Sequence, residues 1–155
     1  MHREDVGDYP RPPALKAVSE PVQVMFDGEL IVDTKAAFRV LETYHPPTYY
    51  IPPSDVVSAR FRPIKQTSMC EWKGRAAYFD IVGPNKRASA AAWCYPRPTP
   101  RFAKIKDYLA IYAEPMDECR VGEMVVMPQP GNFYGGWVTE NITGPIKGAP
   151  GTNHW

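Results

Sequence analysis

The segment Val22-Gln23-Val24-Met25-Phe26-Asp27-Gly28-Glu29-Leu30-Ile31-Val32-Asp33 decides the fold of this chain. Two runs rich in β-branched and aromatic residues flank Asp27-Gly28, a dipeptide that strongly favours a two-residue hairpin turn. In the first run, large side chains alternate around Gln23, as in a strand with one buried face. The segment therefore predicts an antiparallel hairpin.

Short elements are predicted on the C-terminal side of this hairpin. Gly83-Pro84-Asn85-Lys86 and Gly122-Glu123 have the composition of turns between strands. Ser54 is a suitable N-cap for a short helix that ends near residue 59, and Thr99-Pro100 is a suitable start for another. The predicted strands are 38–43, 74–82, 87–95, 108–113, 119–121 and 124–127.

Proline sets the fold class. The chain has 155 residues and 18 prolines, more than double the usual share of about 5%. Proline breaks helix interiors and central strands, which argues against a helical bundle. We expect a mainly β fold, a small antiparallel two-sheet sandwich or open barrel with one or two short helices.

The domain organisation follows from composition along the chain. Residues 1–20 read as an extended N-terminal arm, because Pro10, Pro12 and Pro13 favour polyproline geometry. Residues 21–155 read as a single β domain. Its glycine-rich segment from residue 128 is expected to pack on the sheet, with Trp137 and Trp155 as large anchors.

Charge and cysteine content exclude several partners. The net charge of +1 offers no basic surface for nucleic acid or for an anionic membrane. No apolar run approaches the ~18 residues of a membrane span, and the charged first residues do not resemble a secretory signal. Three widely spaced cysteines are no disulfide framework. We therefore expect a soluble cytoplasmic protein, and the sequence leaves a homodimer open.

The common motifs of cofactor and metal sites are missing from the sequence. It contains no P-loop, no Gly-x-Gly-x-x-Gly, no Gly-x-Ser-x-Gly and no Cys-x-x-Cys. Nor does it contain Asp-x-Asp carboxylates to hold Mg²⁺ against a triphosphate. We therefore expect neither a cofactor nor a metal.

Several strings, spread over nearly the whole chain from about residue 10, resemble the domain-of-unknown-function family 427. They include Leu41-Glu42-Thr43, Tyr49-Tyr50-Ile51-Pro52, Cys70-Glu71-Trp72-Lys73-Gly74, Ala92-Trp93-Cys94-Tyr95-Pro96 and Tyr134-Gly135-Gly136-Trp137. The resemblance implies a small fold of two β-sheets that meet at an angle, like a tent, and no agreed catalytic residues. The family also carries a nucleotidyltransferase label. Nucleotidyl transfer needs metal-holding carboxylates and a phosphate cradle, and this sequence lacks both patterns, so that activity is disfavoured.

Glu42 and His45 are the first candidate catalytic residues. They lie three residues apart beside Pro46 and Pro47, and a carboxylate next to an imidazole can tune a general base. On a strand this spacing would place them on opposite faces, so a turn must bring them together. The alternative is a histidine that caps a loop and a glutamate in a surface ion pair.

Lys73 and Lys106 are candidates because aromatic residues stand near each of them in the sequence. A lysine in an aromatic pocket can bind an anionic group or act as a base. The alternative is a lysine whose stem covers apolar surface. Cys70, near Lys73, is predicted to be an inert thiol.

Many amphipathic aromatic residues predict an aromatic-lined pocket, because their polar atoms need partners. We expect its walls to include Tyr50, Tyr78, Trp93, Tyr95 and Trp137. Two functions fit. One is a cofactor-independent enzyme that acts on a small molecule through Glu42, His45 and a lysine. The alternative is a non-catalytic module that binds a small ligand or peptide.

Overall fold

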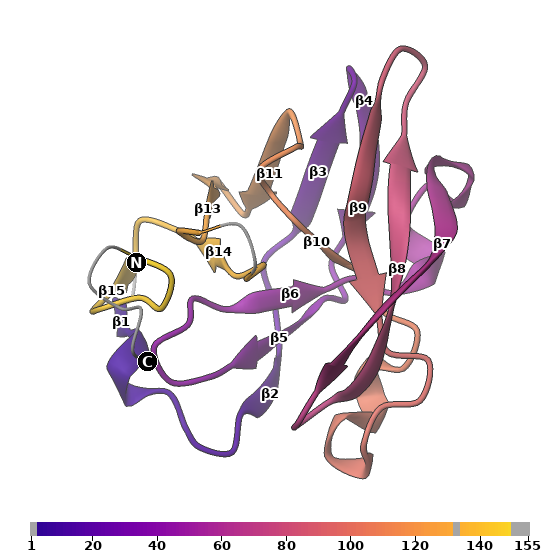
Figure 1. Ribbon diagram of the computed structural model, residues 1–155. Coiled ribbons are helices and arrows are strands. Elements are labelled where there is room, and N and C mark those ends of the chain that lie inside the picture. Colours follow the sequence, from indigo (N-terminus) through magenta and orange to yellow (C-terminus); the bar gives the residue numbers. More distant parts are fainter. Residues whose placement is uncertain (1–2, 132–133, 150–155) are drawn as a thin grey trace.

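Antiparallel sheets are the main regular structure of the molecule, which confirms the predicted mainly β fold (Figure 1). The computed structural model describes residues 3–131 and 134–149. Within these residues the strands form three sheets of three or four strands and two pairs of short strands. The sheets do not close into a barrel among the described residues.

The first sheet has the order β12-β11-β3-β4 and contains the decisive hairpin. Strands β3 (Val22–Phe26) and β4 (Glu29–Thr34) are antiparallel. Their turn has positive φ at Asp27 (52°) and Gly28 (78°), as expected for Asp-Gly in a tight hairpin. Strands β11 (Glu118–Val121) and β12 (Met124–Val125) form the predicted second hairpin.

The second sheet has the order β10-β9-β8-β7. Strands β8 (Gly74–Val82) and β9 (Arg87–Cys94) lie where the sequence predicts them, and β10 is only Ala110–Ile111. The longest strand, β7 (Phe61–Cys70), is absent from the sequence prediction. It lies at the edge of the sheet and is exposed along most of its length, so its sequence lacks the alternation of a half-buried strand.

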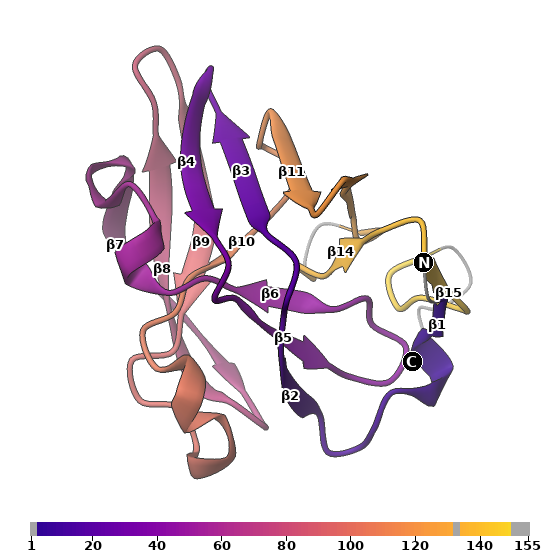
Figure 2. The same ribbon diagram turned by 180° about the vertical axis from the view of Figure 1, so that it is seen from behind.

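The third sheet, β2-β5-β6, runs crosswise to the second (Figures 1 and 2). It consists of β2 (Ala14–Ala17), β5 (Phe38–Leu41) and β6 (Thr48–Tyr50). Just after β6, Ile51 exchanges two backbone hydrogen bonds of 2.8 Å with Leu109, the residue before β10. This bridge fixes the line along which the two sheets meet.

The predicted helices are short 3-10 turns. The helix expected from Ser54 is two turns, η2 (Pro53–Asp55) and η3 (Ser58–Arg60), and the Ser54 cap is wrong because η2 begins after Pro52. The helix expected from Thr99 is η4 (Pro100–Ile105), which follows Thr99 as predicted. The Thr99 hydroxyl donates to the Trp72 carbonyl (2.6 Å) and does not cap the helix.

The two terminal segments lie side by side (Figures 1 and 2). Strand β1 (Glu4–Asp5) pairs in parallel with β15 (Ile142–Thr143), and η1 (Val6–Asp8) follows β1. The glycine-rich segment forms β13 (Met127–Pro128) and β14 (Trp137–Val138), which pair with each other. Residues 1–2 of the arm and 150–155, with the expected anchor Trp155, lie outside the described residues.

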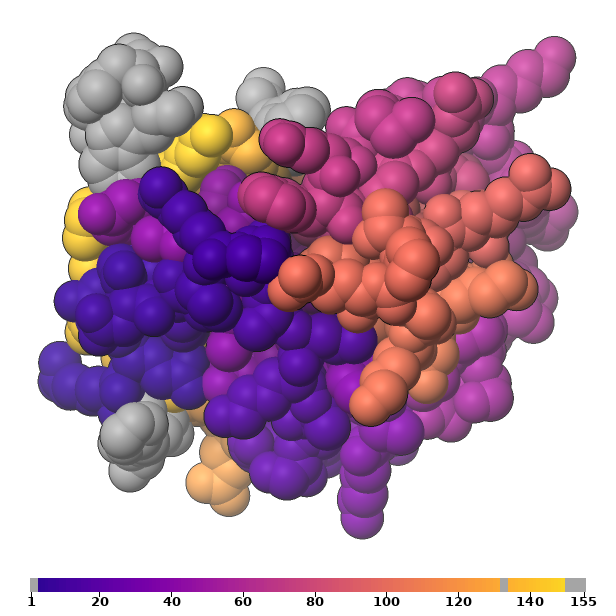
Figure 3. All heavy atoms as spheres, turned by 90° about the horizontal axis from the view of Figure 1, so that it is seen from below, coloured from indigo at the N-terminus to yellow at the C-terminus, as the bar shows by residue number. Residues whose placement is uncertain are grey.

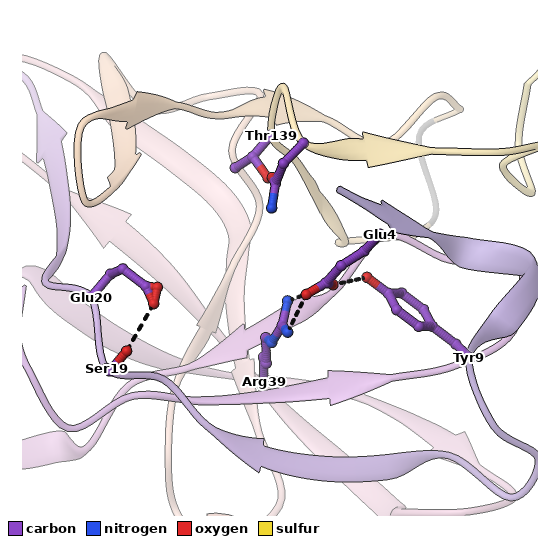
Figure 4. Close-up of polar contacts among 7 residues, drawn as sticks. Glu4, Tyr9, Ser19, Glu20, Arg39 and Thr139 are labelled. Atoms are coloured by element: carbon purple, nitrogen blue, oxygen red, sulfur yellow. Dashed lines mark hydrogen bonds and ion pairs between the residues drawn. The ribbon is translucent and has the colours of Figure 1, made fainter. Parts of the chain in front are cut away.

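The N-terminal arm is extended but is tied to the domain through β1 and β2. Figure 3 shows the underside of the molecule, which this indigo segment shares with the salmon-coloured segment of η4. Figure 4 shows the Glu4 carboxylate between Arg39 and Tyr9. Arg39 donates two hydrogen bonds to it, of 3.0 and 2.7 Å, and the Tyr9 hydroxyl donates a third of 2.5 Å.

We expect this cluster to make stability depend on acid pH. Burial raises the pKa of the Glu4 carboxyl, but hydrogen bonds from Arg39 and Tyr9 and the charge of Arg39 outweigh burial, so the pKa lies below its ordinary value of 4.5. A depressed folded-state pKa contributes stability above the unfolded value, and this contribution is lost as the pH falls through the folded pKa. In urea titrations between pH 7 and pH 3, Glu4→Gln should lower the free energy of unfolding at pH 7 by about 1–3 kcal/mol. It should also flatten the decline below pH 4.5.

The matched control for Glu4→Gln is Glu29→Gln. Glu29 also receives two hydrogen bonds from one arginine, Arg60. The side chains of Arg60 and Glu29 are 29% and 36% exposed, whereas those of Arg39 and Glu4 are 12% and 21% exposed. Because solvent screens the more exposed pair, its loss should lower the free energy of unfolding by less. An equal effect of both variants would contradict the assigned role of Glu4.

The hydrophobic core lies on both faces of the second sheet. Alternation along β8 and β9 places Ile81 and Ala92 in a core shared with the first sheet, and Tyr78 and Trp93 in a second cluster that faces the third sheet. The candidate site forms on this second, aromatic face. No helix among the described residues has the length and apolar character needed to cross a membrane.

Candidate functional site

An aromatic cluster fills the space between the second and third sheets. Trp93 is its centre, with ring centroids 4.7 Å from Tyr112 and 6.4 Å from Tyr78, the residue opposite it on β8. The rings of Tyr50 from β6 and Tyr95 after β9 also pack together, with their centroids 6.2 Å apart. The strand periodicity that places alternate residues on one face accounts for this gathering.

The polar atoms of the cluster satisfy one another. The hydroxyls of Tyr50 and Tyr95 and the indole N–H of Trp93 lie within hydrogen-bonding reach of each other. Tyr78 shares a 2.9 Å hydrogen bond with Ser68. Burial raises the pKa of Tyr50 and Tyr95 and, with the neighbouring Tyr78, raises that of Tyr112 to about 12. Tyr50, Tyr95 and Tyr112 are therefore neutral at physiological pH.

A cavity of about 240 Å³, the central cavity, opens against this cluster. It shares Glu42, His45 and Lys147 with a hollow of about 560 Å³ on one side. On the other side it shares Gln129 and five other residues with a hollow of about 780 Å³. The central cavity is thus the narrow middle of a longer cleft. Its aromatic walls are Tyr50, Tyr78, Trp93, Tyr95, Tyr112 and Tyr134.

A tight turn brings Glu42 and His45 to the same cavity. The His45 backbone N–H donates to the Glu42 carbonyl (2.9 Å), and Tyr44 between them has a φ of 65°. Both chain ends hold this turn, since Tyr44 N–H donates to Val6 and Lys147 N–H donates to Tyr44. The turn that the sequence analysis required for a Glu42–His45 pair is present, and both residues line the central cavity.

The buried amide of Gln129 determines the tautomer of His45. Its Oε1 accepts the Gly136 backbone N–H (3.1 Å), so its Nε2 is the donor to the Lys147 carbonyl (2.8 Å). The second hydrogen of Nε2 then faces His45 Nδ1 at 3.1 Å, and Nδ1 must be the acceptor. The proton of neutral His45 therefore resides on Nε2.

His45 is neutral at physiological pH. Burial lowers its pKa, the positive charges of Lys147 and Lys73 lower it further, and the negative charge of Glu42 opposes them without reversing the direction. Tyr134 packs edge-on against the imidazole, with ring centroids 4.9 Å apart. His45 thus presents a hydrogen-bond donor, Nε2–H, rather than a free basic lone pair.

Lys73 is a buried cation that lines the same cavity. It lies in the turn between β7 and β8, and its backbone carbonyl accepts a hydrogen bond from Thr99 (3.1 Å). Only 7% of the residue is exposed. Its Nζ lies 5.9 Å from the ring centroids of Tyr95 and Phe102, so the side chain passes between aromatic rings into the cavity.

Two charged groups of the cavity have no direct partner among the residues that the structure describes. Within residues 3–131 and 134–149, neither the Glu42 carboxylate nor the Lys73 ammonium makes a hydrogen bond or an ion pair. Lys73 is buried, and burying a charge without a partner is costly, whereas Glu42 is partly exposed. Both groups line one small cavity and are therefore available to a ligand.

The other sequence candidates have different environments. Lys106 lies outside the central cavity, on the surface, where it pairs with Asp107 at 3.1 Å. Trp137 does not line the cavity, because it is buried in the other core cluster, the one that the first and second sheets share. The remaining predicted wall residues, Tyr50, Tyr78, Trp93 and Tyr95, do line it, as does Cys70.

Among the cavity residues that sequence reasoning missed, the four that bear most on the site are Gln129, Lys147, Tyr112 and Tyr134. Three of them lie in the glycine-rich C-terminal segment, which has no periodicity to indicate where its side chains point. The amphipathic character of Tyr134 is a signal, but no pattern in the sequence places its ring in the pocket. No group of three His, Cys, Asp or Glu side chains that could hold a metal ion occurs in the described part of the chain.

Comparison with known proteins agrees with the resemblance seen in the sequence. A family model described as a domain of unknown function, DUF427, matches residues 14–122. The matched segment contains Glu42, His45 and Lys73, whereas Gln129 and Lys147 lie beyond it. No curated protein matches the chain.

Proposed function

The chain belongs to the DUF427 family, and we propose that it is a cofactor-independent enzyme that transfers a proton on a small molecule in the central cavity. The observation that carries this proposal is the convergence of Glu42, His45 and Lys73 on one aromatic-lined cavity. At about 240 Å³ the cavity is smaller than the roughly 300–1,000 Å³ of sites for drug-sized ligands. A compact metabolite fits this volume.

The reaction class that suits these groups is proton abstraction next to a carbonyl. The Glu42 carboxylate takes a proton from the carbon, the C–H electron pair forms a C=C bond, and the carbonyl electrons move to its oxygen. His45 Nε2–H donates a hydrogen bond to the negative oxygen, a role suited to a neutral imidazole. Glu42 then returns the proton to the same carbon, the C=C electron pair forms the new C–H bond, and the oxygen electrons restore the carbonyl.

Deuterium exchange into a panel of small carbonyl compounds tests this function. Compounds that bind the protein are incubated with it in D₂O, and loss of C–H signals is followed by ¹H NMR. We expect exchange with the wild-type protein and a rate lower by about 10²–10⁴-fold with Glu42→Gln. Glu29→Gln, remote from the cavity, is the matched carboxylate control and should exchange at the wild-type rate.

The second candidate is the non-catalytic binding module. It is favoured by the hydroxyls of the aromatic walls, which already have hydrogen-bond partners within the protein and so are not free for catalysis. Compounds that bind in the cavity but exchange no deuterium with wild-type protein would contradict the enzyme and support this module. Exchange that persists unchanged in Glu42→Gln would remove Glu42 from the mechanism.

A further inference from the structure

The charges that line the central cavity are unbalanced. Lys73 and Lys147 are basic, Glu42 is the acid, and His45 donates through Nε2–H. Lys147 lies beside the ring of Tyr134, with its Nζ 5.4 Å from the centroid. Neither lysine has a carboxylate within ion-pair distance among residues 3–131 and 134–149. The side chains that line the cavity therefore have a net charge of one positive unit.

Of the two lysines, Lys73 is the better placed to bind an anionic ligand. Its burial removes it from water, whereas Lys147 is only half-buried. A desolvated ammonium needs an anionic or strongly polar acceptor. The rings of Tyr95 and Phe102 near Nζ supply only a weak quadrupole attraction. A ligand carboxylate would complete this environment.

The aromatic walls of the cavity indicate the shape and polarity of the ligand. The six Tyr and Trp rings of the lining favour a flat, largely apolar molecule, because rings stack on planar surfaces. We infer that the central cavity takes a small planar monocarboxylate, with its carboxylate on Lys73 and its flat body against Trp93 and Tyr95. This inference rests on the proposed function and names the class of its substrate.

Benzoate and its neutral isostere benzamide are suitable probes. Titrations followed by ¹H–¹⁵N NMR should show benzoate binding at least about tenfold more tightly than benzamide, the usual gain for a charge-assisted hydrogen bond. Benzylamine, a cation of similar size, should bind more weakly than both. Cyclohexanecarboxylate, which keeps the charge but is not flat, should bind less tightly than benzoate.

Substitution of Lys73 shows how much of the affinity for benzoate depends on the charge of the ligand and how much on its shape. Lys73→Met should bring benzoate down to the affinity of benzamide and leave benzamide unchanged, whereas Lys73→Arg should keep the preference for the anion. Lys104→Met, at an exposed lysine outside the cavity, is the matched control. Urea unfolding of each variant identifies any loss that comes from misfolding, and Lys73→Arg keeps the test decisive if Lys73→Met does not fold.

Cys70 reports whether the probe occupies the cavity. It lines the cavity and is half-exposed, whereas Cys94 and Cys119 are buried. Benzoate should therefore slow alkylation of Cys70. Equal affinities for benzoate and benzamide, no binding of benzoate, or binding without protection of Cys70 would overturn the inference. None of these results would bear on deuterium exchange, which tests the proton transfer separately.

Discussion

Replacement of Trp137 by alanine should lower the free energy of unfolding by about 3–5 kcal/mol, the usual cost of removing a large core side chain. Trp137 is 1% exposed and stacks on Tyr49, with ring centroids 5.1 Å apart. Its Nε1–H donates to the carbonyl of Ile111 in β10 (2.8 Å). Loss of that donor leaves a buried carbonyl unpaired, which by itself costs about 1–3 kcal/mol and places the expected loss for Trp137→Ala toward the upper end of the first range. Domains are stable by only about 5–15 kcal/mol, so the variant should be close to unfolding.

Urea denaturation followed by far-UV circular dichroism measures this effect without relying on tryptophan fluorescence. Trp137→Phe keeps an aromatic ring against Tyr49 and should show mainly the cost of the lost hydrogen bond. Trp72→Ala is the matched control, because Trp72 is 39% exposed and its removal should change stability by less than about 1 kcal/mol. Similar losses in both alanine variants would contradict the core position of Trp137.

Replacement of Gln129 by glutamate should add a proton to Nδ1 of His45 and convert the neutral imidazole into an imidazolium. The new carboxylate oxygen would face Nδ1 in place of the amide N–H, so Nδ1 would have to carry a proton. A buried carboxylate next to an imidazole also favours the imidazolium. We expect the pKa of His45 to rise by more than one unit, from below its ordinary value of 6.5 to above it, which corresponds to about 1.4 kcal/mol or more. The donor at Nε2 would remain, but the neutral imidazole would be lost.

NMR of the imidazole nitrogens tests this prediction directly. In the wild-type protein the ¹⁵N shifts should identify the Nε2–H tautomer, and a pH titration should give the pKa. The chain has three histidines, so the His45→Asn variant assigns the signals. An Nδ1–H tautomer in the wild-type protein would mean that the Gln129 amide is reversed. The predicted effect of Gln129→Glu would then fail.

Local patterns predicted the parts of the fold that local residues control. Asp27-Gly28 requires a particular turn, and the alternation along β8 and β9 divides their side chains between the two core clusters. Strand β7 was missed because it is an edge strand with polar residues on both faces and Pro63 within it. Its position depends on pairing with β8, which no pattern within its own sequence reveals.

The candidate site was predicted as far as short-range spacing allowed. Glu42 and His45 belong to one turn, so the sequence could pair them. It could not distinguish Lys73 from Lys106, because aromatic neighbours along the chain do not determine which lysine faces a cavity. Gln129 contacts His45 across 84 residues, and no local pattern indicates such a contact. Trp137 was expected at a pocket wall, whereas the fold places it in the core.

The way both terminal segments hold the His45 turn has a consequence for biosynthesis. A nascent chain emerges N-terminus first, so the hairpins of residues 22–34 and 74–94 are available for pairing long before residues 129–147 are made. Tyr44 receives its contact from Lys147, and His45 receives its contact from Gln129. The nascent protein therefore has most of its sheets before it has an ordered site. Any catalytic competence must begin only after synthesis has passed residue 147.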